Sequence, residues 1–337
     1  MPDAPGAGPV KGPAGAVATP SSATPARGAP LPRGEETVRG IALIAGAYLV
    51  ISGTDAAVKW ALPEVGTAVA MIWRGVIGAA CVALLARGRG LFPRNRRLLA
   101  VRSLLHTGVS ATWYWAWARG MPLADSYAVA AAAPLLMTVL AIPMLGESVG
   151  WRRWTATLVG FGGVLVMLQP SGDLWRIETP ALLLAVTAMA VTRIWTRVLA
   201  RSDTPSAIAF WLMVAHVPMG LALLPAFPPP SGSFVPSLGA AVALIGFGAA
   251  NAVAHILFGR AFALAPVAVL APFEYSALIW GGLLGFLIWG EVPAWTTLAG
   301  AAIIVGAGLY TLRRERVRRA AERREADAAA AGTAPGT

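Results

Sequence analysis

Several charged side chains of this 337-residue chain lie inside apolar runs, where each needs a partner or a ligand. Glu274 and Tyr275 lie within LAPFEYSALIW, and Arg74 lies within AVAMIWRGVIG. A carboxyl group in apolar surroundings can exchange a proton, or it can pair with a cation such as Arg74 or Lys59 for folding. Arg74 has no acid close to it in sequence, so its partner comes from another segment or from a ligand. The sequence leaves both alternatives open.

Two further pairs of polar residues are spaced four residues apart, which places each pair on one face of a helix. Asp55 and Lys59 can form an ion pair that lets the helix insert into an apolar phase, or can separate to bind a polar or zwitterionic solute. Asn251 and His255 can line a pocket or hydrogen-bond a neighbouring helix. His106 is expected in the core, and the three histidines are too scattered to indicate a metal site.

The aromatic cluster WYWAW covers residues 113–117 and brings Trp113, Tyr114 and Trp117 to neighbouring positions on a helix. Such rings can stack on a flat ligand, or they can form the aromatic belt that marks a membrane interface. The position of the cluster at the end of an apolar run favours the belt. Secondary candidates for a ring-binding wall are Trp73, Tyr127 and Trp280.

The composition indicates an integral membrane protein, because 57% of the residues are hydrophobic, only 13% are charged and the mean hydropathy is +0.65. The net charge of +11 comes from arginines between apolar runs, which favours a role in membrane topology over nucleic-acid binding. Cys81 is the sole cysteine, so an intrachain disulfide is excluded. No Walker motif is present and no cofactor is predicted, so ATP is not the expected energy source.

Cutting the chain at proline, glycine and charge clusters leaves ten apolar windows, of which most have the roughly 20 residues that a membrane-spanning helix needs. The fold class predicted is therefore all-α, with ten transmembrane helices. The windows are 40–60, 65–86, 98–118, 123–145, 154–168, 179–200, 206–225, 236–262, 266–289 and 295–312.

Arginines are concentrated in every second connection between the windows, at 87–97, 152–153, 201 and beyond 312. The positive-inside rule then predicts a multi-pass protein of the bacterial cytoplasmic membrane with both termini in the cytoplasm. Arg193, inside the window 179–200, is expected to extend its guanidinium to the cytoplasmic face. The polar segment 1–38 is predicted to be disordered, and the basic segment 313–337 is predicted to lie against anionic lipid headgroups.

The chain also contains an internal repeat, in which Gly146 and Glu147 correspond to Gly290 and Glu291. The predicted units are 39–170 and 175–312, each with five helices. Five is an odd number, so the second unit enters the membrane from the opposite side, as in inverted-repeat secondary transporters. Each glycine is expected to end a helix, and each glutamate to accept backbone N–H bonds where the next helix begins.

Four segments carry a family resemblance: PLAD at 122–125, a proline at 134 followed after eleven residues by Gly-Glu, RRWTATLVGFGGVLVMLQP at 152–170, and GE…GAAIIVGAGLYTLRRE at 290–315. Over residues 40–315 the chain resembles the EamA branch of the drug/metabolite transporter superfamily. It departs from the family pattern at Leu278, where a proline is common in the second unit. The resemblance implies transport of a small molecule, and similar members import riboflavin or S-adenosylmethionine or export amino acids.

The function expected is secondary active or facilitative transport of a small organic metabolite, an aromatic one being favoured, by alternating access and without enzymatic activity. Expected partners are the solute, membrane lipids and protons, and nucleic acid is not one of them; the sequence does not predict the oligomeric state. An integral-membrane lipid-modifying enzyme and a non-transporting membrane scaffold are the alternatives. The enzyme would need clustered nucleophile, base or metal-ligand residues, and the sequence shows no such pattern.

Overall fold

The computed structural model describes residues 34–145, 151–168, 176–265 and 270–307, together with 309, 310, 313, 317 and 320. Over these residues the chain is helical and contains no strand, which confirms the predicted all-α class. The expectations for the first 33 residues, for Gly146 and Glu147, and for most of 313–337 lie outside this part of the chain. Residues 34–38 belong to the first helix, although the sequence predicts disorder for them. The prediction differs because the helix begins with polar residues, before the apolar run on which its expected start depends.

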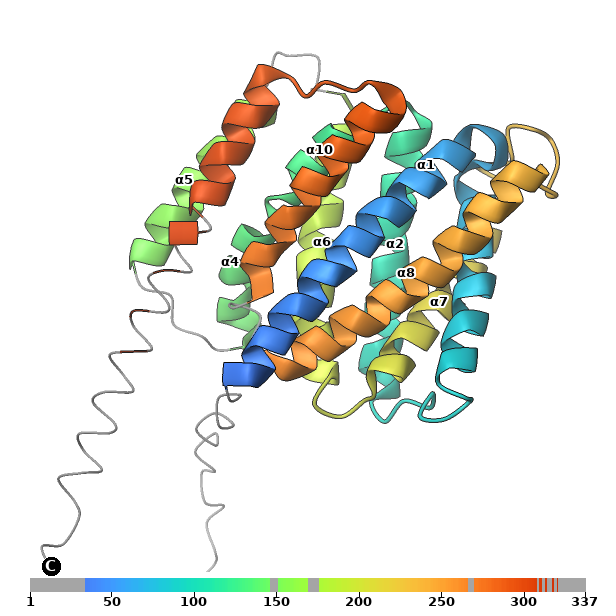
Figure 1. The fold of residues 1–337 in the computed structure, drawn as a ribbon, viewed down its shortest axis with the longest axis horizontal. Coiled ribbons are helices and arrows are strands. Elements are labelled where there is room, and N and C mark those ends of the chain that lie inside the picture. The colour runs from blue at the N-terminus through green and yellow to red at the C-terminus, as the bar shows by residue number, and fades with distance from the viewer. Residues whose placement is uncertain are drawn as a thin grey trace, which may run out of the picture.

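The helices lie side by side, and helices of the two predicted units are intermixed (Figure 1). In the first unit they are α1 (Gly34–Leu85), α2 (Arg96–Ala118), α3 (Leu123–Ala130), α4 (Ala133–Leu145) and α5 (Trp151–Leu168). In the second they are α6 (Glu178–Leu199), α7 (Pro205–Leu223), α8 (Leu238–Leu264), the 3-10 helix η1 (Ala271–Tyr275), α10 (Ser276–Trp289) and a last helix, Trp295–Ala307. α1 packs along α7 and α8, whereas α10 packs against α1 and α3, so the main contacts cross between the units.

Four described helices are long and apolar enough to cross a membrane: Glu36–Leu85, Glu178–Leu199, Pro205–Leu223 and Leu238–Leu264. Shorter apolar helices cover Leu123–Met137, Phe273–Trp289 and Trp295–Ala307. This supports an integral membrane protein. The windows 123–145 and 266–289 are each interrupted in the structure, the first between α3 and α4 and the second by η1, which apolar length alone does not reveal.

α1 is 52 residues long, about 78 Å at 1.5 Å per residue, which is far longer than one membrane crossing. It is divided at Gly66, whose backbone has a positive φ of 70° and ψ of 173°. A side chain there would also meet Pro230 Cδ at 2.9 Å. The break thus separates the first two predicted windows into two helical segments that meet at a glycine.

Candidate functional site

A cavity is lined by side chains from α1, α2, α3, α6, α8, η1 and α10, which come from both of the predicted units. The space free of protein atoms in and around this cavity is about 990 Å³, open solvent at its mouth included. Charged residues in its wall are Asp55, Arg74, Arg102, Arg193 and Glu274. Charges that are costly in lipid are therefore collected around one space inside the protein.

Arg74 lies at the centre of a polar cluster that joins three helices. Its Nη1 donates hydrogen bonds to Ser110 Oγ at 2.9 Å and to Tyr114 OH at 2.6 Å, and its Nη2 lies 3.1 Å from His255 Nε2. Its guanidinium also lies 5.8 Å from the centre of the Phe247 ring. The partners of Arg74 thus come from α2 and α8, which agrees with the alternative that they belong to other helices. These partners are neutral groups.

All three histidines of the chain converge on this cluster, although they are far apart in sequence. His106 and His255 both line the cavity, with ring centroids 5.3 Å apart, and His216 Nε2 lies 3.1 Å from Ser110 Oγ. The prediction of a core position for His106 is therefore incomplete, because its ring also forms part of the cavity wall. Within the described residues, no group of His, Cys, Asp or Glu has the arrangement of a metal site.

Glu274 is buried in η1 and pairs with Arg193 of α6, with 3.4 Å between Glu274 Oε1 and Arg193 Nε. The guanidinium of Arg193 also lies over the rings of Tyr48 and Phe258, at 5.4 and 4.9 Å from their centroids. Two expectations are thereby corrected: Arg193 does not extend to the membrane face, and the cation beside Glu274 is neither Arg74 nor Lys59. Tyr275 is buried beside Glu274 but does not line the cavity.

Asp55 and Lys59 bind separate partners, which contradicts the first of the two alternatives left open for them, an ion pair with each other. Asp55 faces the cavity and accepts a hydrogen bond of 2.6 Å from Tyr127 OH. Lys59 forms an ion pair with Glu291, and both side chains are largely buried, 8% and 17% exposed. The longer-range partners follow from tertiary packing, which brings α10 against both α1 and α3.

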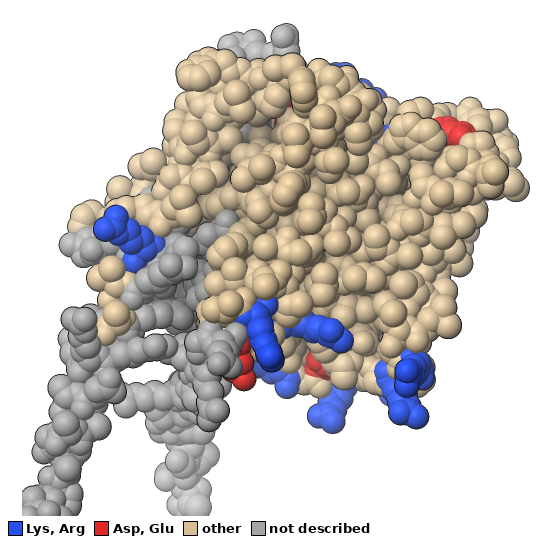
Figure 2. All heavy atoms as spheres, viewed as in Figure 1, with Lys and Arg blue, Asp and Glu red and all other residues tan. Residues whose placement is uncertain are grey.

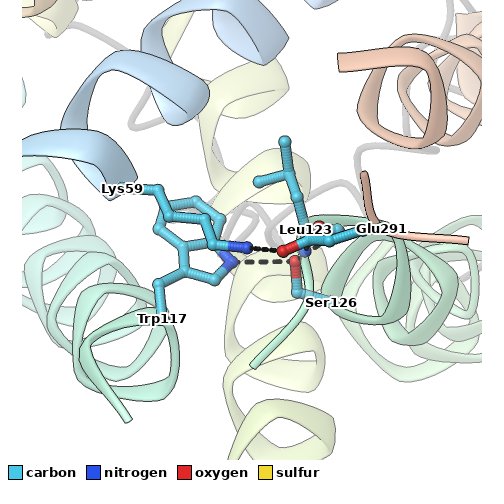
Figure 3. A network of polar contacts seen from close by, with 5 residues as sticks. All are labelled: Lys59, Trp117, Leu123, Ser126 and Glu291. Atoms are coloured by element: carbon cyan, nitrogen blue, oxygen red, sulfur yellow. Dashed lines mark hydrogen bonds and ion pairs between the residues drawn. The ribbon is translucent and has the colours of Figure 1, made fainter. Parts of the chain in front are cut away.

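Glu291 connects α1, α3 and the end of α10 (Figure 3). Besides its pair with Lys59, its Oε2 accepts a hydrogen bond of 2.8 Å from the backbone N–H of Leu123, where α3 begins. The prediction that Glu291 accepts a backbone N–H bond at the start of a helix is confirmed. That helix is α3, however, and not the helix that follows Glu291 in the sequence, as was expected. Gly290 ends α10 with a left-handed φ of 66°, as predicted.

The aromatic cluster lines the cavity, so its placement in a membrane-interface belt is corrected for three of its residues. Trp113, Tyr114 and Trp117 are buried and contribute to the wall. Trp117 Nε1 donates to Ser126 Oγ at 2.9 Å, which fixes the indole beside α3 (Figure 3). Tyr127 also lines the cavity, whereas Trp73 and Trp280 do not.

Asn251 lines the cavity, and its Nδ2 also donates to Thr54 Oγ1 of α1 at 3.2 Å, so both alternatives left open for it hold. Sequence reasoning missed Arg102, which is buried in the wall and donates from Nε to Thr196 Oγ1 at 3.1 Å. The signal was available, because Arg102 lies inside the window 98–118 and a charge there must face the protein interior.

The proteins most informative for comparison with this chain are membrane transporters. The EamA-like transporter family matches residues 38–169. The chain is 33% identical to a "Riboflavin transporter" of Rhizobium johnstonii over 221 residues, covering 64% of this chain and 70% of that one. It is also 33% identical to a "Riboflavin transporter" of Vibrio cholerae, but that match covers 57% of this chain and 63% of the relative, less than two thirds of its length.

Two more distant similarities complete the comparison. An "S-adenosylmethionine uptake transporter" of Rickettsia prowazekii is 26% identical over 203 residues, which cover 59% of this chain and 67% of that one. A solved crystal structure matches with a TM-score of 0.60 over 81% of this chain and 96% of the other. Its sequence is only 20% identical, so that match concerns the fold alone.

Proposed function

This chain belongs to the EamA-like transporter family of the drug/metabolite transporter superfamily, and on that premise we propose that it carries a small organic metabolite across a bacterial cytoplasmic membrane by alternating access. The observation that carries the proposal is the cavity between the two units, with ionised and aromatic side chains of both in its wall. A binding site shared by two repeats can be exposed to either side when the repeats move relative to each other.

We propose ten membrane-spanning helices arranged as two inverted five-helix repeats. The division of α1 at Gly66 supports this number, since its two helical segments can supply two separate crossings. Lys and Arg side chains gather at the lower end of the face in Figure 2, the end at which α1 begins, and this supports a cytoplasmic location for that end. Single cysteines placed at 146–153 and at 290–295 should react with an impermeant reagent from opposite sides, and labelling from one side only would contradict inverted repeats.

Transport is tested by reconstituting the purified protein into liposomes and measuring the uptake of labelled solutes. Riboflavin and S-adenosylmethionine are suitable first probes because similar proteins carry those names. We expect saturable uptake of at least one metabolite in a wider panel of vitamins, amino acids and organic acids, and none in protein-free liposomes. Chemical turnover of a lipid without uptake would support an enzyme, and neither activity would support a scaffold.

The Lys59 and Glu291 pair closes one end of the cavity in this proposal, because it ties α1 to the connection after α10. Glu291→Gln keeps an oxygen for the Leu123 N–H but removes the ion pair. In a Cys81→Ala background, Ser126→Cys reports on access to this end, since Ser126 is fully buried. Glu291→Gln should accelerate labelling of that cysteine about tenfold, the ratio that 1.4 kcal/mol produces. An unchanged labelling rate would show that the pair does not control access.

A further inference from the structure

The five charged groups of the cavity do not balance one another. Glu274 pairs with Arg193, and Asp55 is held by Tyr127. Throughout the described part of the chain, no carboxylate oxygen lies within the 4.0 Å ion-pair limit of Arg74 or Arg102. Arginine stays protonated in proteins, so two cations share the cavity with one carboxylate that has no cationic partner of its own.

Arg74 and Arg102 are also incompletely hydrogen-bonded. Both side chains are buried, each only 4% exposed. Arg74 Nε and Arg102 Nη1 have no hydrogen-bond partner among the described residues, and the partners of their other nitrogens are neutral. A buried charge without a counterion costs several kcal/mol. With three arginines and two carboxyl groups in its wall, the cavity has one more cationic than acidic side chain, and this excess favours the entry of an anion.

Four polar residues of the cavity wall follow one another along α2. Arg102, His106, Ser110 and Tyr114 follow at intervals of four residues, so they form one stripe on the helix. Trp113 and Trp117 line the cavity at the Tyr114 end of this stripe, and the centroid of the Trp117 ring lies 6.0 Å from that of Tyr114, whose hydroxyl Arg74 binds. The cationic and the aromatic parts of the wall are thus adjacent and arranged end to end.

We infer that the solute is an organic oxyanion with a flat ring, whose acidic group is bound by Arg74 and Arg102 while its ring packs against Trp113 and Trp117. The inference rests on the proposed function and specifies its substrate class. A guanidinium binds carboxylate and phosphate oxygens through its N–H donors, and Arg74 Nε and Arg102 Nη1 each supply one unpartnered donor. The indole rings supply the apolar surface that a flat ring buries.

The test is a binding series with one ring and different charges, measured calorimetrically on the purified protein. Indole-3-acetate is the anion, tryptophol the neutral compound and tryptamine the cation; flavin mononucleotide and riboflavin form a second pair with a phosphate. We expect the anion to bind at least tenfold more tightly than its neutral counterpart in at least one pair, and tryptamine to bind most weakly. The pair that responds identifies a carboxylate or a phosphate. Equal or tighter binding of the neutral and cationic compounds would overturn the inference.

Variants separate charge recognition from folding. Arg102→Gln should lower the ratio of indole-3-acetate affinity to tryptophol affinity about tenfold, whereas Arg102→Lys, which keeps the charge, should retain most of that ratio. Arg260→Gln, at an exposed arginine of α8, is the matched control. An anion preference that survives Arg102→Gln in a folded protein would overturn the assignment of Arg102. Anion-selective binding without uptake into liposomes would contradict the proposed transport function but not this inference. Uptake of neutral solutes without a preference for anions would contradict this inference but not the transport function.

Discussion

Uptake by the Arg74→Ala variant in liposomes is expected to fall at least 100-fold below that of the unmodified protein. The guanidinium of Arg74 holds Ser110, Tyr114 and His255 from two other helices in one cluster. Truncating a buried, hydrogen-bonded charge costs about 2–5 kcal/mol, and every 1.4 kcal/mol is a factor of ten in binding. The initial rate of solute uptake at equal amounts of reconstituted protein measures the effect.

Arg74→Lys serves as the matched variant for charge, because lysine keeps the cation but lacks the planar set of donors. We expect an intermediate loss for this variant, since a single ammonium group cannot replace contacts to both α2 and α8. Arg260→Gln should transport normally. If Arg74→Ala kept more than a tenth of the uptake, the cluster would not be part of the binding site.

Glu274→Gln is expected to lower the free energy of unfolding by about 3–5 kcal/mol, because it leaves Arg193 as a buried cation without a counterion. The contacts of Arg193 with Tyr48 and Phe258 retain only part of its stabilisation. Denaturant unfolding of the purified protein in detergent, followed by circular dichroism, measures the change. A loss below 1 kcal/mol would mean that the pair contributes little to folding.

The double variant Glu274→Gln, Arg193→Met tests whether the carboxylate has a second role. Removing both charges should restore much of the stability lost in Glu274→Gln, as expected when the two sites interact. We propose that Glu274 also acts in transport, so the stable double variant should show little uptake. Normal uptake would assign Glu274 to folding alone, which is the other alternative that the sequence left open.

The sequence determined the helices because apolar length and helix-breaking residues act locally. Eight of the ten predicted windows correspond to a helix, to one segment of α1 or to a pair of short helices, and the windows 266–289 and 295–312 lie partly outside the described residues. Gly290 could likewise be assigned to the end of a helix from its residue type and position. The cost of a polar group in lipid depends on one residue and its immediate neighbours in sequence. This local property is enough to identify four candidates: Arg74, Asn251, His255 and Glu274.

The tertiary structure decided which of these groups meet. Lys59 and Glu291 are 232 residues apart, and Arg193 and Glu274 come from two elements of the second unit, so spacing along the chain predicts neither pair. The structure also placed Trp113 and Trp117 in the cavity wall, although their position at the end of an apolar run favoured a membrane interface. The physical reason is that burial requires a charge or an indole N–H to have a partner, but only the packing of distant helices determines which partner is within reach.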